Sequence, residues 1–363
     1  MSVRTDSYWM NRALVSSRKG LGFVHPNPMV GAVVLDDQDN LVGEGFHSSY
    51  GSSHAEVHAL KAAGAKAKNG TLYVTLEPCC HHGKTPPCTD AILHSGIKNV
   101  FVACLDPNSK VAGKGIQALQ KAGLNVKVGI CESRAKKLNA AFFHLIQHQA
   151  PFVRAKVAMT VDGFMGRKDQ RLMLSGAQLE RITMRLRAES HGIMVGVNTV
   201  LTDDPRMNVR GKNFNQKPVR IIIDSQLRTP SSARIFEKKN GDVWIFCDEK
   251  KIDSKEWKAL FNVAQLIPMA VIQDKIPPQH ILNELAKKGL TSILIEGGVG
   301  LLQSFEREKL IHQWIIYLNS NNLKLTHPAE KLVKLDPNPL FALEFQSVIR
   351  RDQDLVITSK SDK

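Results

Sequence analysis

The segments HAEVHAL, residues 54–60, and TLYVTLEPCCHHGKTPPC, residues 71–88, decide the fold of the first part of the chain. The Ala-rich first segment predicts a helix over residues 54–65, which Gly64 and then Gly70 bring to an end. The β-branched and apolar residues 71–76 predict a buried strand. Outward from this pair, residues 88–95 and 115–122 predict helices, and residues 99–103 and 126–129 predict strands. Strands separated by helices indicate a parallel or mixed sheet with helices on its faces.

The same alternation continues on both sides of this core. Upstream, residues 8–18 predict a helix, and residues 30–35 and 41–46 a strand pair around a polar turn. Downstream, a long helix over residues 133–149 leads to Ala150-Pro151, where we expect a domain boundary. A second α/β cycle follows, with a helix at 177–188 and strands at 152–159, 192–195, 219–223, 243–246 and 292–295. We therefore predict two domains, residues 1–149 and 150–363, which also suits a chain of 363 residues.

The strongest chemical signal is the order His54-x-Glu56, then Pro78-Cys79, then Cys88. A catalytic zinc ion takes three protein ligands and keeps its fourth tetrahedral position open, and His54, Cys79 and Cys88 can supply those three. Glu56 stands two residues from His54, so the two share no helix face and can converge only at the helix N-terminus. From there Glu56 can move protons without ligating the metal. This order of residues is typical of zinc-dependent nucleobase deaminases.

The loop between the two cysteines leaves other readings open. A structural zinc site requires a fourth protein ligand, which Cys80, His81 or His82 could provide. A structural site would, however, leave the presence of Glu56 unexplained. The eight residues between Cys79 and Cys88, rather than two, also bring His82 and Lys84 to the rim of the metal site. There they could meet a substrate phosphate or ring oxygen, or they could simply be solvated.

Composition places the chain among ordinary globular proteins. Hydrophobic residues make up 43% and charged residues 23%, and no apolar run approaches the roughly 20 residues that span a bilayer. The first residues lack the order of a secretory signal, so we expect a cytoplasmic protein without a membrane partner. Six cysteines in this length do not indicate a disulfide framework, and we expect Cys104, Cys131 and Cys247 to fill cores.

The formal net charge of +15 raises a nucleic-acid hypothesis. The positive residues are scattered in short groups without interleaved aromatic residues, however, so they do not form the pattern of a nucleic-acid surface. A phosphorylated small substrate accounts for part of the excess charge. We therefore expect a small-molecule partner and no nucleic acid, with a nucleic-acid-editing deaminase as the open alternative.

Three stretches of the first domain closely resemble one family: HPNPMVGAVV, then HAEVHAL through TPPCTDAI, then DPNSKVAGKGIQALQKAG. The chain resembles the bifunctional riboflavin-biosynthesis deaminase–reductases, in which the PC-x8-C insert is characteristic. The resemblance implies a cytidine-deaminase-like three-layer domain followed by a dihydrofolate-reductase-like α/β domain. It implies zinc-dependent deamination of 2,5-diamino-6-(5-phosphoribosylamino)pyrimidin-4-one, then NADPH-dependent reduction of its ribose to a ribityl chain. We expect a homo-oligomer, either a dimer or a tetramer.

The second half carries the resemblance in AKVAMTVDGFMG, RAESH, VGVNTVLTDDPRMNVR, IIIDSQLR and ILIEGGVGLLQSF. Glycines 297, 298 and 300 follow a strand and open a helix, so backbone N–H groups can approach a pyrophosphate. The substrate-binding residues predicted along the whole chain are Asn27, His82, Lys84, Arg187, Met207, Arg210 and Glu296. The cofactor-binding residues that the resemblance implies are Ala158, Met173, Thr199, Asp203, Ser225, Gly297, Gly298 and Gly300. Lys156 either orients the substrate or pairs with a carboxylate.

Two departures from the family pattern concern the reductase domain. Met173-Leu174-Ser175 stands where the family usually has Trp-Ile-Ser or Trp-Ile-Thr, so an aromatic wall against the cofactor would be missing. The segment after Trp314 lacks the Pro- and Gly-marked loop that the family tends to show. A third hypothesis follows, in which the deaminase is active and the reductase-like domain serves only as a scaffold.

Overall fold

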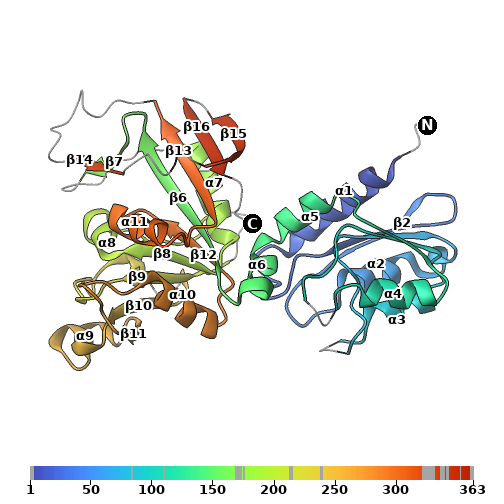
Figure 1. The fold of residues 1–363 in the computed structure, drawn as a ribbon, viewed down its shortest axis with the longest axis horizontal. Coiled ribbons are helices and arrows are strands. Elements are labelled where there is room, and N and C mark those ends of the chain that lie inside the picture. Colours follow the sequence, from blue (N-terminus) through green and yellow to red (C-terminus); the bar gives the residue numbers. More distant parts are fainter. Residues whose placement is uncertain are drawn as a thin grey trace. The chain divides into compact units, whose positions relative to one another are not determined.

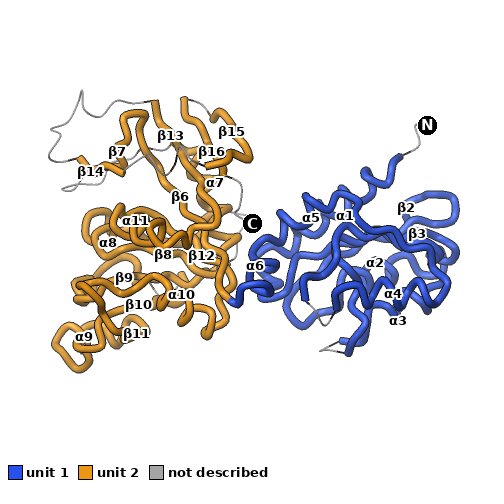
Figure 2. The backbone as a smooth tube through the Cα atoms, in the orientation of Figure 1, with its two compact units in different colours: residues 1–149 blue, residues 150–363 orange. Residues whose placement is uncertain are grey.

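The computed structural model divides the chain into two compact units, Met1–Gln149 and Ala150–Lys363 (Figures 1 and 2). The residues that it describes are 4–82, 85–108, 111–167, 174, 176–211, 216–237, 240–320, 332–335, 340, 343–351 and 353–359. Within these residues, no helix combines the length and the apolar character needed to cross a bilayer.

The first unit is a five-stranded mixed sheet in the order β2-β1-β3-β4-β5. Strand β1 runs antiparallel to both of its neighbours, whereas β3, β4 and β5 are parallel. The strands are β1 Gly31–Leu35, β2 Leu41–Phe46, β3 Thr71–Val74, β4 Asn99–Val102 and β5 Asn125–Val128. The helices are α1 Asp6–Ser17, α2 Ala55–Ala63, α3 Cys88–His94, α4 Lys114–Lys121, α5 Glu132–Leu138 and α6 Ala140–His148.

Helices cover both faces of this sheet, and the alternation of β1 shows why. Ala32 and Val34 face one core, to which α2, α3 and α4 contribute apolar residues. Val33 and Leu35 face the other core, where α1, α5 and α6 pack. Figure 1 shows α1 and α5 on one side of the sheet and α2, α3 and α4 on the other. The predicted three-layer architecture is therefore confirmed.

One prediction of local structure in this unit was wrong, and the prediction for Cys131 holds only in part, because this residue packs against the core of α1 and α5 without being fully buried. The helix expected over residues 133–149 is interrupted at Asn139, whose side chain accepts a hydrogen bond from the Met29 backbone N–H at 2.8 Å and donates one to the Met29 carbonyl oxygen at 2.9 Å. These tertiary bonds outweigh the helical tendency of the sequence. Cys131, expected in a core, is only half-buried, with a left-handed φ of 60° at the start of α5. Cys104 and Cys247 are buried as predicted.

The second unit contains a nine-stranded sheet in the order β11-β10-β9-β8-β12-β6-β13-β16-β15, and the short strands β14 and β7 pair separately. All strands from β11 to β13 in this order are parallel, and β16 and β15 are antiparallel. The strands are β6 Phe152–Thr160, β7 Phe164–Arg167, β8 Gly192–Gly196, β9 Val219–Ile223, β10 Val243–Asp248, β11 Gln265–Met269, β12 Ser292–Glu296, β13 Gln313–Asn319, β14 Leu332–Lys334, β15 Phe345–Arg351 and β16 Asp354–Ser359. The helices are α7 Ala177–Ala188, α8 Val197–Asp203, α9 Lys255–Leu260, α10 Pro278–Lys287 and α11 Val299–Arg307.

The order of these strands brings several loops together. Strand β12 lies between β6 and β8, although it comes much later in the chain than either of them. The carboxyl ends of β8, β9 and β12 therefore meet at one edge of the sheet. In parallel α/β sheets, ligands bind at such an edge, close to the place where the strand order reverses.

Candidate active sites

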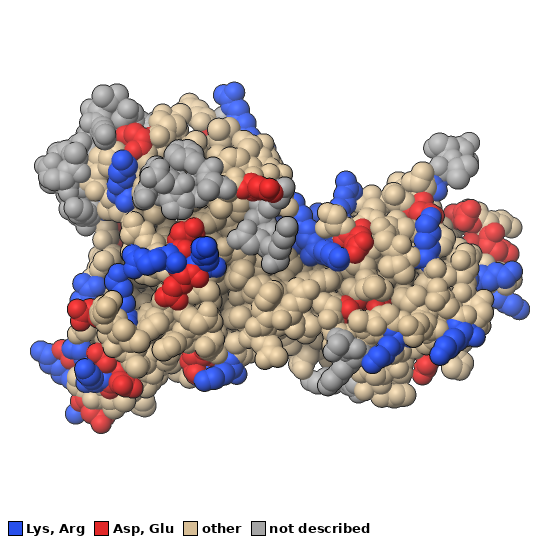
Figure 3. All heavy atoms as spheres, viewed as in Figure 1, with Lys and Arg blue, Asp and Glu red and all other residues tan. Residues whose placement is uncertain are grey.

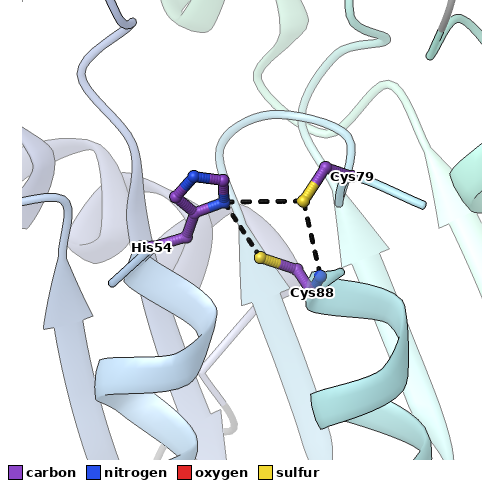
Figure 4. A group of neighbouring side chains, drawn as sticks. All are labelled: His54, Cys79 and Cys88. Carbon is purple, nitrogen blue, oxygen red and sulfur yellow. Dashed lines mark hydrogen bonds between the residues drawn. The ribbon is translucent and has the colours of Figure 1, made fainter. Parts of the chain in front are cut away.

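Three metal-ligand atoms meet at the N-terminal ends of two helices of the first unit (Figure 4). His54 is the N-cap residue of α2, and Cys88 is the first residue of α3. The Nδ1 atom of His54 lies 3.1 Å from the Sγ atom of Cys88 and 3.5 Å from that of Cys79. A tetrahedral zinc ion with bonds of about 2.0–2.3 Å places its ligand atoms roughly 3.3–3.8 Å apart. The 3.5 Å distance lies in this range and the 3.1 Å distance is slightly shorter, so a small outward movement of the Cys88 or His54 side chain would fit the three residues to zinc.

The thiols of Cys79 and Cys88 shift each other's pKa in opposite directions. The hydrogen bond with Cys88 lowers the pKa of Cys79 to about 4, while the same contact, together with burial, raises the pKa of Cys88. The backbone N–H of Cys88 also donates to the Sγ atom of Cys79 at 3.4 Å. A divalent cation between the two sulfurs favours the thiolate of each, because ligation requires the deprotonated form.

Glu56 lies in the first turn of α2 with 3% of its surface exposed. Burial raises the pKa of Glu56 to about 7, although the charge of His54 acts in the opposite direction. Its Oε2 atom has no hydrogen-bond partner among the described residues. A buried carboxyl group with a free acceptor atom and a pKa near neutrality is suited to taking up and returning a proton. The structure brings Glu56 and His54 to the same end of α2, as their spacing predicts.

A cavity of about 320 Å³ opens beside these residues. It is lined by His54, Glu56, Glu77 and Cys79, and by polar residues from other segments: Asn27, His47, Asp106 and Asn108. From the loop between the two cysteines, His81 and Thr85 line the cavity, whereas His82 is exposed and does not belong to its described wall. The prediction that His82 meets the substrate is therefore not supported by its position, and Lys84 lies outside the described residues.

His47 was missed by the sequence analysis. It is 2% exposed, and burial lowers its pKa, so the imidazole is neutral near pH 7. Its Nδ1 atom lies 3.3 Å from the Ser53 carbonyl oxygen and its Nε2 atom 3.2 Å from the Nδ2 atom of Asn27. We assign the proton to Nδ1, because the Ser53 carbonyl oxygen can only accept a hydrogen bond. The Nε2 atom then accepts a hydrogen bond from the Asn27 amide group. This bond leaves the Asn27 amide oxygen to accept from a ligand.

Glu77, also missed, holds the far wall of the cavity in place. Its Oε2 atom accepts hydrogen bonds from the backbone N–H groups of Gly113 at 2.9 Å and Asp106 at 3.3 Å. Its Oε1 atom accepts from Gly115 at 3.0 Å and Ile116 at 3.4 Å. A carboxylate that satisfies four backbone donors fixes the segment that presents Asp106 to the cavity. The only sequence signal for this role is that Glu77 stands immediately before the Pro78-Cys79 pair.

In the second unit, a cavity of about 770 Å³ lies at the carboxyl edge of the sheet. Its wall brings together six of the predicted cofactor residues: Thr199, Asp203, Ser225, Gly297, Gly298 and Gly300. They come from α8, from the turn after β9, from the turn between β12 and α11 and, for Gly300, from the first turn of α11. Ala158 is half-buried on β6 and is not part of this described wall, and Met173 lies outside the described residues.

The glycine pair after β12 shows how a dinucleotide fits this cavity. Gly297 and Gly298 have φ values of 69° and 78°, in the left-handed region that favours glycine. A Cβ atom at Gly298 would lie 3.3 Å from the Oγ1 atom of Thr199, so a side chain there would crowd the wall. Gly298 is also the N-cap of α11, whose first N–H groups point outward from the helix end. This combination suits a pyrophosphate.

A second, smaller cavity of about 240 Å³ holds three predicted substrate residues, Arg187, Met207 and Arg210. Arg187 is buried, and its guanidinium group donates to the Glu296 carboxylate at 2.6 and 3.0 Å. Lys156 also pairs with Glu296 at 3.5 Å, the carboxylate pairing that was one of the two roles considered for it. Burial raises the pKa of Glu296, but the charges of Arg187 and Lys156 outweigh it and hold the pKa at about 2.

Two protein-family models match the chain, one in each unit. Residues 3–104 match the cytidine and deoxycytidylate deaminase zinc-binding region, and residues 151–323 match the RibD C-terminal domain. The first match contains the His54, Cys79 and Cys88 cluster, and the second contains the larger cavity of the second unit except for Val333.

Individual relatives match the chain over nearly its whole length. The riboflavin biosynthesis protein RibD of Aquifex aeolicus is 40% identical over 86% of each chain, and that of Escherichia coli is 35% identical over 86% of this chain and 87% of the relative. Among solved structures, form 2 of Acinetobacter baumannii RibD has a TM-score of 0.82 at 35% identity and covers 98% of this chain and 99% of its own. A diaminohydroxyphosphoribosylaminopyrimidine deaminase/5-amino-6-(5-phosphoribosylamino)uracil reductase from Thermotoga maritima has a TM-score of 0.84 at 30% identity and covers 98% of both.

Proposed function

Because the chain belongs to the RibD family of bifunctional riboflavin-biosynthesis deaminase–reductases, we propose that His54, Cys79 and Cys88 hold its zinc ion and that Glu56 carries its protons. The proposed substrate is 2,5-diamino-6-(5-phosphoribosylamino)pyrimidin-4-one, in keeping with the activity named for the Thermotoga relative. The observation that carries the proposal is the buried Glu56 carboxyl group, with an unpartnered oxygen, beside three converging ligand atoms.

The chain's own residues account for the proton movements of deamination. Zinc, when bound, supplies a Lewis acid that lowers the pKa of water toward neutrality. Glu56 accepts one proton from water as the C–O bond forms and delivers it to the ring nitrogen. It then passes the second proton of the water to the amino group, which leaves as ammonia when the C–N bond breaks. Asn27 and His47 orient the ring through the hydrogen-bonding groups that they present to the cavity.

The second unit carries the reduction. NADPH, when bound, supplies the hydride for the sugar carbon. We propose that Gly297, Gly298 and Gly300 hold its pyrophosphate, that Thr199 and Asp203 lie at the cofactor in the same cavity, and that Ser225 lies at its adenosine end. Arg187 and Arg210 bind the phosphate of the substrate, and Met207 lies beside them. Glu296 faces the ribose and fixes the position of Arg187. Ala158 and Met173 remain predictions for the cofactor site, as do His82 and Lys84 for the deaminase substrate.

Substitution of the proton carrier tests the assignment. In the Glu56→Gln variant, ammonia release should fall at least about 100-fold, the range that general acid–base catalysis contributes. Oxidation of NADPH with the deaminated substrate should be unchanged, because that reaction uses the other unit. Glu132→Gln, at an exposed ion pair on α5, is the matched control and should retain both activities. Loss of both activities in a folded Glu56→Gln protein would contradict two separate sites.

We also propose that the enzyme is a cytoplasmic dimer or tetramer. The outermost strand of the second sheet, β15, supports this, because Phe345, Val348 and Ile349 on it are 41–54% exposed. Among the described residues β15 has a neighbouring strand on one side only, and apolar side chains on such a strand edge favour association with another chain. Light scattering of the purified protein measures the number of chains, and a monomer at micromolar concentration would contradict the proposal.

A further inference from the structure

The smaller cavity of the second unit has an unusual concentration of positive charge. Four of its seven described wall residues are arginines: Arg187, Arg206, Arg210 and Arg234. Arg187 is buried at its base, whereas the other three are exposed at its rim. Four guanidinium groups and the carboxylate of Asp204 surround about 240 Å³, and guanidinium groups so placed suit a small anion with several acceptor oxygens.

Three of these arginines already have a carboxylate partner. Arg187 pairs with Glu296 at 2.6 Å, Arg206 with Glu237 at 2.8 Å and Arg210 with Glu180 at 2.7 Å. For Arg234, the described residues contain no carboxylate oxygen within 4.0 Å of its side chain. Within the described part of the chain, the Arg234 side chain is therefore the one guanidinium at this wall without an ion pair. The Asp204 carboxylate also lines the wall, where it accepts a hydrogen bond from the Arg234 backbone N–H.

The backbone that carries Arg234 is fixed at several points. The Arg234 backbone N–H donates to the Asp204 carboxylate at 2.8 Å, which ties it to the turn before Met207. Arg220 of β9, 0% exposed, donates from its guanidinium group to the carbonyl oxygens of Ile235, Glu237 and Gly241. A buried arginine that satisfies three carbonyl groups holds this segment against the sheet, so Arg234 is presented to the cavity from a rigid base.

We propose that Arg234 binds the phosphate monoester of the reductase substrate and makes the reductase select phosphorylated over unphosphorylated pyrimidines. This inference rests on the proposed function, which places the substrate phosphate at Arg187 and Arg210. A phosphate dianion needs more positive charge than these two offer, because each of them is already neutralised by a carboxylate. Arg234 supplies that charge, and as a planar guanidinium it can donate two parallel hydrogen bonds to the phosphate oxygens.

The test compares the reductase reaction of Arg234→Gln with two substrates, the deaminated ribosylaminouracil phosphate and its dephosphorylated form. The KM for the phosphorylated substrate should rise about tenfold or more, since a hydrogen-bonded charge pair is lost. The kcat value, the affinity for NADPH and the kinetics with the dephosphorylated substrate should stay unchanged. Inhibition by ribose 5-phosphate should weaken in parallel. Arg234→Lys, which keeps the charge, should recover part of the affinity, and Arg181→Gln, on the exposed side of α7, is the matched control.

The outcomes are distinguishable. If the unaltered protein does not oxidise NADPH with either substrate, the proposed function fails. If it is active and Arg234→Gln leaves the KM for the phosphorylated substrate unchanged, the role of Arg234 is refuted. An equal rise in KM for both substrates would assign Arg234 a structural role and would also overturn the proposal. Should Arg234→Gln not fold, the comparison of Arg234→Lys with the unaltered protein on both substrates decides between the same outcomes.

Discussion

Cys79, Cys80 and Cys88 stand close together in the sequence, but they do not have equivalent positions. The Sγ atoms of Cys79 and Cys88 lie with Nδ1 of His54 within 4.8 Å of one another, and Cys80 does not belong to this group. The structure therefore favours three protein ligands, which leave a coordination position open, over a closed site with four.

Removal of single sulfur atoms tests this ligand set. We expect Cys88→Ser to lose bound zinc and to reduce deamination by more than the roughly 10- to 100-fold that loss of a hydrogen-bond partner of a metal ligand causes. Cys80→Ser, one residue from a ligand, should keep one zinc per chain and most of its activity. Metal analysis by atomic absorption, together with ammonia release, measures both effects. Loss of zinc from Cys80→Ser would show that Cys80 is the fourth ligand of a structural site.

How far single residues could be predicted depends on whether one local pattern contains them. His54, Glu56, Cys79 and Cys88 fall within 35 residues whose types and spacing already specify a metal and a proton carrier. His47 and Asp106 reach the same cavity from other segments, and neither belongs to a spacing that chemistry requires. Likewise, the sequence could not show that Glu296 and Arg187, 109 residues apart, are paired in the interior.

At the scale of elements, the turn between β12 and α11 is the part of the second unit with the strictest backbone requirement. Gly298→Ala would force a side chain into the left-handed region, at about 1–2 kcal/mol, and would place its Cβ atom 3.3 Å from Thr199 Oγ1. We expect NADPH to bind about tenfold more weakly, and a fluorescence titration of the cofactor measures this.

Gly289 provides the control for the backbone effect alone. Its φ is 82°, close to that of Gly298, and a Cβ atom there would meet nothing within 4 Å. Gly289→Ala should therefore lose similar stability while its NADPH affinity stays unchanged. If both variants bind NADPH equally well, the glycine turn does not contact the cofactor.

Elements were predictable where burial alone decides them and unpredictable where a distant contact intervenes. The four apolar residues of β1 that follow Gly31 form a strand because their side chains alternate between two cores, with two residues packed in each. The break between α5 and α6 depends on the bonds of Asn139 to Met29, 110 residues away in the sequence, so helical propensity could not reveal it. Sequence periodicity reports how apolar and polar residues alternate locally, and it carries no information about such distant partners.

At the scale of the whole molecule, net charge is a poor guide to function. Figure 3 shows lysine and arginine side chains interspersed with aspartate and glutamate on the face that it draws. The concentration of charge that matters is the four-arginine cavity, whose members come from α7, the segment after α8 and the segment after β9. The fold brings these segments together, and for that reason the excess of +15 could not be located from the sequence.

The two units have separate hydrophobic clusters, and this predicts that they act independently. Every cluster of buried apolar residues belongs wholly to one side of Gln149-Ala150 within the described part of the chain. We expect residues 1–149, produced alone, to fold and release ammonia from the deaminase substrate, and residues 150–363 to oxidise NADPH with the deaminated product.

The position of the cut provides the control. A fragment of residues 1–138 would lack α6, whose Phe142 and Phe143 pack against the cluster shared by α1 and α5. Because that cluster would then be open to water, the shorter fragment should unfold at a lower temperature than residues 1–149 in a thermal melt. If residues 1–149 fold but release ammonia only after residues 150–363 are added, the deaminase site depends on the second unit and the independence of the two units is refuted.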